Sequence, residues 1–325
     1  MLSRVTLAWS ENLLSASSGM PCTLGCAAFS ATRQPHKPQA ARSRASPRHN
    51  LAWMSTAALA LVLAAAVLHA TWNRLLHGAD DRLAAAAVGA VVGAALLLPV
   101  TIAAPPARVW PLALASGAAE AAYFAFLAAA YRRGELSFTY PVARGMAPFL
   151  ITLGGAAVLG EPLTAARVAG SLALGVGLAV IAHAGLAKGR GTALMFAAFT
   201  GITIAVYSVI DADAVRSANA VGYLGAVTLV QATLLLGAVC LNSGPASRIP
   251  VRLRASARAG TGIGVGSLAA YLLVLLAYQR APASPVATLR ELSILLGILM
   301  AREKTGWRVW AGGILCVLGA ALTIL

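Results

Sequence analysis

A few charged side chains stand inside long apolar stretches of this sequence, and they are the first candidates for chemistry. Glu120 lies near the middle of one stretch, Arg144 and Arg290 lie early in two others, and Glu291 directly follows Arg290. If such stretches cross a bilayer, each charge costs about 2.5–3.5 kcal/mol on insertion scales, so it indicates either a site or a buried ion pair. Glu120 could bind a proton or a cation; alternatively, it pairs with a basic group.

The two arginines could act together on an anion. A guanidinium group is permanently charged and can bind a carboxylate or a phosphonate through two hydrogen bonds. One interpretation is that Arg144 and Arg290 converge on an anionic group. The other is that each arginine pairs with an acid such as Glu120 or Glu291, or extends its side chain to the membrane interface.

Uncharged polar residues accompany these charges. His69 and Asn73 are four residues apart, so on a helix they share one face and form a polar stripe. This stripe could line a pathway, or His69 could form a hydrogen bond between helices. Tyr123 and Tyr271 could supply hydroxyl groups to a cavity, or they could serve packing alone.

Four further acidic residues are predicted to lie at the ends of apolar stretches. Asp211 and Asp213 close one stretch, and we expect them in a solvated loop. Glu161 and Glu303 lie in short polar breaks, and we expect them to cap helix N-termini, where a carboxylate contributes a few tenths to about 1 kcal/mol.

The composition indicates that these side chains belong to a membrane protein. Of the 325 residues, 59% are hydrophobic and 11% are charged, whereas soluble proteins carry about 25% charged residues. Apolar runs alternate with short polar breaks, and each run is close to the ~20 residues that cross the hydrocarbon core. The sequence therefore predicts an all-α polytopic membrane protein, surrounded by a lipid bilayer. Its ten predicted transmembrane helices are residues 55–73, 83–104, 110–131, 138–160, 164–185, 191–210, 218–241, 261–279, 284–301 and 306–325.

The net charge of +15 does not indicate a nucleic-acid partner, because the basic residues lie in the breaks between apolar runs and form no basic face. More of them lie in odd-numbered than in even-numbered loops, which places the odd loops in the cytoplasm. The basic N-terminal tail opposes this assignment, so the orientation stays open.

Neither a metal site nor a cofactor is expected. Cys22 and Cys26 have no His or Cys partners at metal-binding spacing, and Cys240 and Cys316 lie inside apolar runs.

Residues 1–53 differ from the rest of the chain. Residues 31–50 are rich in Pro, Ser and Arg and show no periodicity, which is a composition typical of disorder. One interpretation is a targeting or regulatory tail, since the segment resembles an organellar transit peptide. The other, which we favour, is a misassigned start, with translation beginning at Met54.

The second half of the chain repeats features of the first. Residues 121–144 and 269–290 share Ala-Ala-Tyr, an apolar run, a Tyr, a turn, Pro-Val and an Arg. A glutamate in a short loop and a Gly-rich span follow in both copies. The repeat unit has five spans, so residues 54–187 and 188–325 would cross the membrane with opposite orientations. Inverted repeats of this kind are common in secondary transporters.

The segment 141–182, with Pro141, Gly160-Glu161 and a Gly-rich closing span, resembles the EamA-type transporters of the drug/metabolite transporter superfamily. The segments 67–77 and 284–325 are similar to the same family, although Arg302-Glu303 stands where Gly-Glu is usual. The resemblance implies ten helices in two inverted five-helix repeats, permease or exporter activity on small organic solutes, no ATP hydrolysis, and a place in the bacterial inner membrane.

We therefore expect a secondary transporter of a small organic metabolite, with Glu120 as a candidate for proton coupling. The alternatives are an intramembrane enzyme and a membrane sensor or scaffold. The sequence contains no catalytic motif such as His-Glu-x-x-His or Gly-x-Ser-x-Gly, and no long loop follows Met54 that could form an output domain. Whether the protein forms a homo-oligomer stays open.

Overall fold

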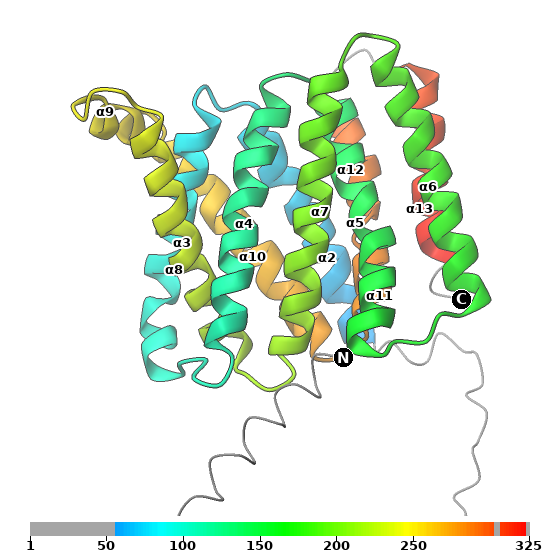
Figure 1. The fold of residues 1–325 in the computed structure, drawn as a ribbon, viewed down its shortest axis with the longest axis horizontal. Coiled ribbons are helices and arrows are strands. Elements are labelled where there is room, and N and C mark those ends of the chain that lie inside the picture. Colours follow the sequence, from blue (N-terminus) through cyan, green and yellow to red (C-terminus); the bar gives the residue numbers. More distant parts are fainter. Residues whose placement is uncertain (1–55, 302–305, 323–325) are drawn as a thin grey trace, which may run out of the picture. The chain divides into compact units, whose positions relative to one another are not determined.

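The computed structural model describes residues 56–301 and 306–322, and these form helices joined by short loops (Figure 1). The predicted extension, residues 1–53, and Glu303 lie outside the described residues. The helices are α2 (Thr56–His77), α3 (Arg82–Ala103), α4 (Trp110–Tyr131), α5 (Leu136–Leu159), α6 (Ala165–Leu186), α7 (Gly191–Ala214), α8 (Ala220–Leu241), α9 (Arg248–Ala255), α10 (Ala257–Tyr278), α11 (Ala283–Leu289), α12 (Leu292–Met300) and α13 (Trp307–Leu322).

Nine of the described segments are long and apolar enough to cross a membrane, with α11 and α12 counted together as one. The tenth predicted span corresponds to α13, which is apolar but shorter over its described length. This part of the chain thus has the fold of an integral multi-pass membrane protein, in agreement with the class predicted from hydropathy.

Short polar side chains fix several of the helix ends. Asp81 accepts a hydrogen bond from the backbone N–H of Ala84 at 3.0 Å at the start of α3. Thr164 caps α6 and Asn219 caps α8 in the same way. Each cap satisfies a backbone N–H that has no partner within its own helix. At the end of α5, Gly160 adopts a left-handed conformation with φ of 68°, which turns the chain out of the helix.

Two features of the helices differ from the prediction. A short basic helix, α9, was not predicted and precedes α10. Helix α10 begins at Ala257, whereas the predicted span begins at residue 261. The ninth predicted span is interrupted at Arg290 and Glu291, where the backbone N–H of Glu291 bonds the carbonyl of Thr288 at 3.0 Å. The interruption escaped prediction because no Pro or Gly occupies it; the sequence continues apolar on both sides.

Glycines bring α6 and α13 into backbone contact. A Cβ atom built on Gly177 would lie 2.6 Å from the carbonyl oxygen of Gly312, and one on Gly319 would lie 2.7 Å from that of Gly170. Small residues at such contacts permit the close packing that holds helices together in lipid. The glycines at these positions therefore serve the packing of α6 against α13.

The helices before residue 187 pack mainly on helices after residue 187. Helices α6 and α13 pack together, α3 packs on α8 and α10, and α4 packs on α7 and α8. Helix α2 packs on α10 and α12, and α5 packs on α6, α7, α11 and α12. Most of these pairs join a helix from before residue 187 to one from after it.

Candidate functional site

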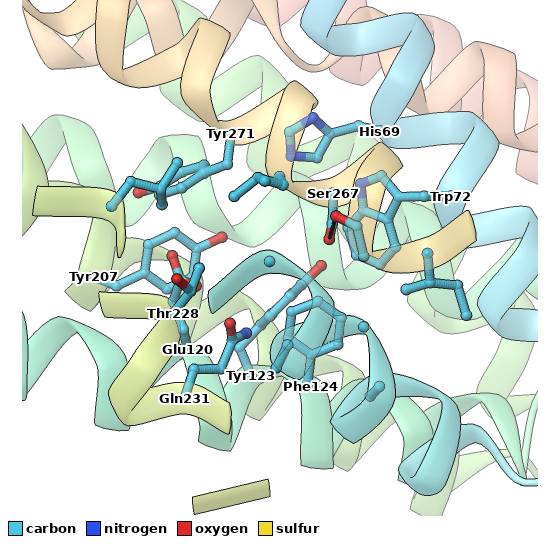
Figure 2. Close-up of a pocket in the computed structure, with 18 residues that line it drawn as sticks. His69, Trp72, Glu120, Tyr123, Phe124, Tyr207, Thr228, Gln231, Ser267 and Tyr271 are labelled. Atoms are coloured by element: carbon cyan, nitrogen blue, oxygen red, sulfur yellow. Dashed lines mark hydrogen bonds between the residues drawn. The ribbon is translucent and has the colours of Figure 1, made fainter. Parts of the chain in front are cut away.

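A cavity lies between α2, α3, α4, α7, α8 and α10 (Figure 2). Its volume is about 40 Å³, which is room for a few water molecules. Small and aliphatic residues of α3, α8 and α10 form part of its wall. The polar or aromatic side chains that face it are His69, Trp72, Glu120, Tyr123, Phe124, Tyr207, Thr228, Gln231, Ser267 and Tyr271.

Helical periodicity explains why α4 presents several of these groups together. Glu120, Tyr123 and Phe124 lie three and four residues apart, so they share one face of the helix. The same spacing places His69 and Trp72 on one face of α2, and Ser267 and Tyr271 on one face of α10. The predicted candidates His69, Glu120, Tyr123 and Tyr271 thus line one cavity. Tyr207 also lines it and was not predicted.

Glu120 interacts electrostatically with a second buried carboxyl group. Its side chain is 7% exposed, and its charge interacts with that of Asp211 on α7. Asp211 is fully buried and accepts hydrogen bonds from the hydroxyls of Tyr223, at 2.6 Å, and Tyr271. Glu120 therefore lines the cavity, and Asp211, on a different helix, is buried behind the wall within electrostatic range of it.

The expectation of a solvated loop at Asp211 and Asp213 is wrong for Asp211. Helix α7 continues to Ala214 and buries Asp211, whereas Asp213 is exposed on the opposite side. A sequence signal for this existed. Asn73 and Asp211 each precede the N-cap residue of the next helix, Asp81 or Asn219, by eight residues. This shared spacing could have indicated that Asp211 lies inside its helix, as Asn73 lies inside α2.

Arg144, Arg290 and Glu291 form a second group of buried charges. Arg144 on α5 lies 3.5 Å from Glu291, measured from Nη2 to Oε1, and the two side chains are 2% and 0% exposed. Arg290 is also fully buried, but no acid of the described residues lies within 4.0 Å of it. Of the predicted alternatives, the ion pair with an acid is found for Arg144. Arg290 forms no such pair with a described residue.

The predicted polar stripe on α2 divides into two roles. His69 lines the cavity, and its Nδ1 donates a hydrogen bond to the carbonyl of Ala65 at 2.9 Å. Asn73 does not line the cavity: its amide donates to the carbonyl of His69 at 2.8 Å and accepts from the hydroxyl of Tyr131 at 2.8 Å. Asn73 therefore joins α2 to α4, and only His69 faces the cavity.

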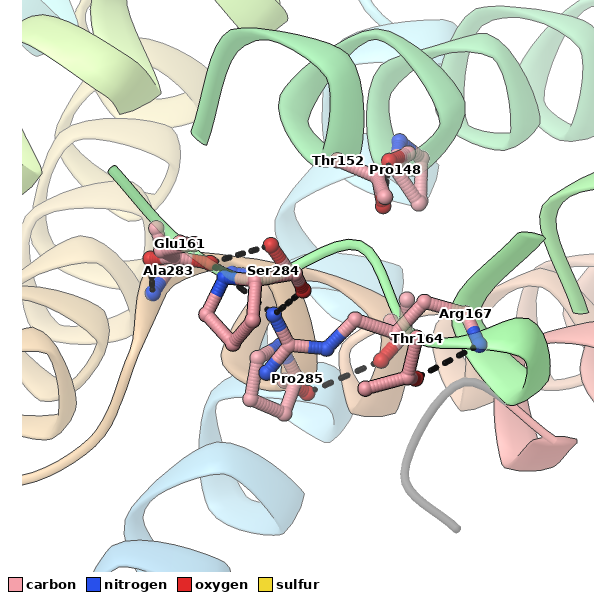
Figure 3. A network of polar contacts seen from close by, with 10 residues as sticks. Pro148, Thr152, Glu161, Thr164, Arg167, Ala283, Ser284 and Pro285 are labelled. Carbon is pink, nitrogen blue, oxygen red and sulfur yellow. Dashed lines mark hydrogen bonds and ion pairs between the residues drawn. The ribbon is translucent and has the colours of Figure 1, made fainter. Parts of the chain in front are cut away.

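Glu161 caps a helix, but not the one that follows it in the chain (Figure 3). Its carboxylate accepts hydrogen bonds from the backbone N–H groups of Ala283, at 2.8 Å, and Ser284, at 3.3 Å, and from the Ser284 hydroxyl. Arg167 lies 3.9 Å from the same carboxylate. Glu161 thus caps α11, while Thr164 caps α6, so this contact links two distant parts of the chain.

At one end of the bundle, Arg252 of α9 is bound to the residue that caps α3. Its Nε donates to Oδ2 of Asp81 at 2.7 Å. Burial of Asp81 disfavours the charged form, but the hydrogen bonds from Arg252 and from the N–H of Ala84 outweigh it and lower the pKa of Asp81 below its usual value. The pair holds α9 against the start of α3.

Within residues 56–301 and 306–322, no three His, Cys, Asp or Glu side chains are grouped as a metal site would need. The described cysteines, Cys240 and Cys316, are free thiols. The groups that face the cavity and could bind a ligand are hydroxyl, carboxyl, imidazole and amide groups.

Comparison with known proteins supports the fold. No protein-family model and no curated protein matches the chain. Among solved structures, 16 chains match. One of them, a crystal structure of a protein, superposes with a TM-score of 0.55 at 21% sequence identity, over 82% of this chain and 95% of the other. This likeness shows a shared fold and carries no information about activity.

Proposed function

We propose that the protein is a secondary transporter, or permease, that moves a small organic solute across the membrane, as its resemblance to the EamA-type family implies. The observation that carries the proposal is the cavity between α2, α3, α4, α7, α8 and α10, which is walled by three helices from each half of the chain and has buried ionisable groups beside it. Ionisable side chains at membrane depth are expensive and are characteristic of solute and ion pathways.

The pairing of helices supports two inverted five-helix repeats. We take α2 to α6 as equivalent to α7, α8, α10, α11–α12 and α13. The exchange then converts the α4–α7 pair into α10–α2, the α3–α10 pair into α8–α4, and the α5–α7 pair into α12–α2, and each of these pairs is in contact. The pairs α3–α8 and α6–α13 convert into themselves. Such an exchange is expected for a two-fold axis in the membrane plane, with the solute site between the halves.

Proton coupling through Glu120 and Asp211 is part of the proposal. Both carboxyl groups are buried, they lie on helices of different halves, and their charges interact. Electrostatic repulsion between two carboxylates is relieved when one of them holds a proton. Protonation would therefore alter the contact between α4 and α7, and rocking of the halves would release the proton on the other side.

Proton movement into proteoliposomes tests this proposal. The purified full chain is reconstituted with a pH-sensitive dye inside, and a panel of amino acids, organic acids, amines and sugars is added singly. At least one compound is expected to move protons in wild type. Glu120→Gln and Asp211→Asn should abolish that signal, whereas Glu135→Gln, at a partly exposed ion pair with Arg190, should retain it. Proton movement that is equal in wild type, Glu120→Gln and Asp211→Asn at equal protein content would exclude coupling through these residues.

A further inference from the structure

The interruption of the ninth span places two opposite charges at helix ends that suit them. Arg290 follows the C-terminus of α11, and Glu291 precedes the N-terminus of α12. A cation at the C-terminal end of one helix and an anion at the N-terminal end of the other match the signs of the helix dipoles, although neither side chain forms a hydrogen bond to a helix end. This arrangement lowers the cost of burying each charge, but a helix end carries only a partial charge and cannot replace a full counter-ion.

The three charges at this point do not balance. Glu291 approaches Arg144 at 3.5 Å, so that pair is neutral. Arg290 has no carboxylate within 4.0 Å among the described residues, and its Nε and both Nη atoms have no hydrogen-bond partner there. One full positive charge thus remains without a direct partner at a completely buried position.

An uncompensated buried charge is strongly destabilising, so a counter-charge is expected when the protein works. Asp211 and Glu291 lie within electrostatic range of Arg290, but the Asp211 carboxylate already accepts the hydroxyls of Tyr223 and Tyr271, and Glu291 approaches Arg144. Arg290 also lies within electrostatic range of His69 and Tyr207, which line the cavity. The unpartnered guanidinium is therefore within electrostatic range of the cavity wall, although Arg290 itself is not part of that wall.

We propose that Arg290 binds an oxyanion group of the transported solute, a carboxylate or a phosphate-type group, while the Arg144–Glu291 pair positions α5 against α12. The planar fork of a guanidinium matches both kinds of oxyanion through two parallel hydrogen bonds. The inference rests on the proposed transport function and narrows its substrates to organic anions. It also assigns different tasks to two arginines that the sequence presents as equivalent.

Thermal unfolding of the purified full chain in detergent, in chloride buffer, tests the charge balance first. Arg290→Met removes an unpartnered charge and should raise the unfolding midpoint, whereas Arg144→Met removes the group that Glu291 approaches at 3.5 Å and should lower it. If Asp211 were the real counter-charge of Arg290, Arg290→Met would lower the midpoint as well, and the proposal would be overturned. Arg290→Gln, of similar length, serves if the Met variant does not fold.

Anion binding is tested on the same proteins, with sodium acetate or inorganic phosphate replacing chloride at constant ionic strength. In wild type, one or both should raise the midpoint, and the more effective anion identifies the group that is recognised. Apparent affinity should fall about a hundredfold in Arg290→Met, since each hydrogen bond to a charged group is worth about tenfold or more. It should be retained in the neutral double variant Arg144→Met/Glu291→Met. An equal response in Arg290→Met and wild type, or none in wild type, would overturn the inference.

Transport and anion binding fail in distinguishable ways. If proteoliposomes move a neutral or cationic solute and no anion raises the midpoint, the transport proposal stands and the anion inference is wrong. If an anion stabilises wild type through Arg290 but no compound of the panel moves protons, the binding site stands and the coupled transport is wrong.

Discussion

Removal of the Glu161 carboxylate should loosen α11 measurably. The carboxylate is the acceptor for the N–H groups of Ala283 and Ser284, and in Glu161→Ala both lose it. Loss of a helix cap costs about 0.5–2 kcal/mol, and a buried N–H left without a partner costs about 1–3 kcal/mol. Because these contributions overlap, we expect a loss of about 3 kcal/mol. Arg167 keeps its hydrogen bond to the carbonyl of Pro162, at 2.7 Å, and adds little.

Hydrogen exchange measured by mass spectrometry detects this loss of stability at α11 itself. About 3 kcal/mol corresponds to roughly a hundredfold rise in the opening equilibrium, so the peptide containing residues 283–289 should exchange about a hundredfold faster in Glu161→Ala. Peptides from α8 should not change. Glu161→Gln retains one carbonyl oxygen and should fall between wild type and Glu161→Ala.

A matched control separates the cap from the loss of a charge in general. Glu135 pairs with Arg190 through two hydrogen bonds, but its side chain is 41% exposed. Exposed pairs contribute less than about 1 kcal/mol, so Glu135→Ala should change exchange little. If exchange at residues 283–289 is the same in wild type and Glu161→Ala, then Glu161 does not hold α11 and the interpretation of Figure 3 is wrong.

Two further predictions concern packing and pH. Gly177→Ala places a Cβ 2.6 Å from a backbone oxygen of α13 and should lower the free energy of unfolding by about 1–3 kcal/mol. The control Gly175→Ala, with no atom within 4 Å of the new Cβ, should cause no loss. Equal unfolding midpoints of the two variants would show that α6 and α13 do not pack this closely. Asp81, whose pKa is lowered by its partners, stabilises the fold above its unfolded-state pKa of about 3.9, and this contribution is lost as the pH falls through the lower folded-state value. The stability difference between wild type and Asp81→Asn should therefore be present at pH 7 and shrink as the pH falls below about 4; a difference independent of pH between 7 and 3 would contradict this assignment.

The helices themselves could be predicted because hydropathy is a local property. An uninterrupted apolar run of about 20 residues has few alternatives to a membrane helix, since its backbone must satisfy its own hydrogen bonds in lipid. The ends were predicted to within a few residues because short polar breaks separate the apolar runs. The break at Arg290 could not be predicted, because no Pro or Gly marks it and the sequence is apolar on both sides.

The site was predicted only in part, for the same physical reason. Glu120, His69, Tyr123 and Tyr271 were selected because polar groups in apolar runs are conspicuous, and all four face one cavity. Which groups lie next to them depends on helices distant in sequence, so the burial of Asp211 was missed. Glu161 was expected to cap a helix N-terminus, but the sequence could not show that its carboxylate serves α11, more than a hundred residues later.

The pairing of Arg144 with Glu291 sets a condition on how the protein is made. The first half is synthesised with a guanidinium in α5 whose counter-charge follows 147 positions later, in the ninth span. Until that span arrives, α5 must keep Arg144 near water or at the membrane interface. The final docking of α5 therefore belongs to the end of synthesis, and the two halves form a single folding unit.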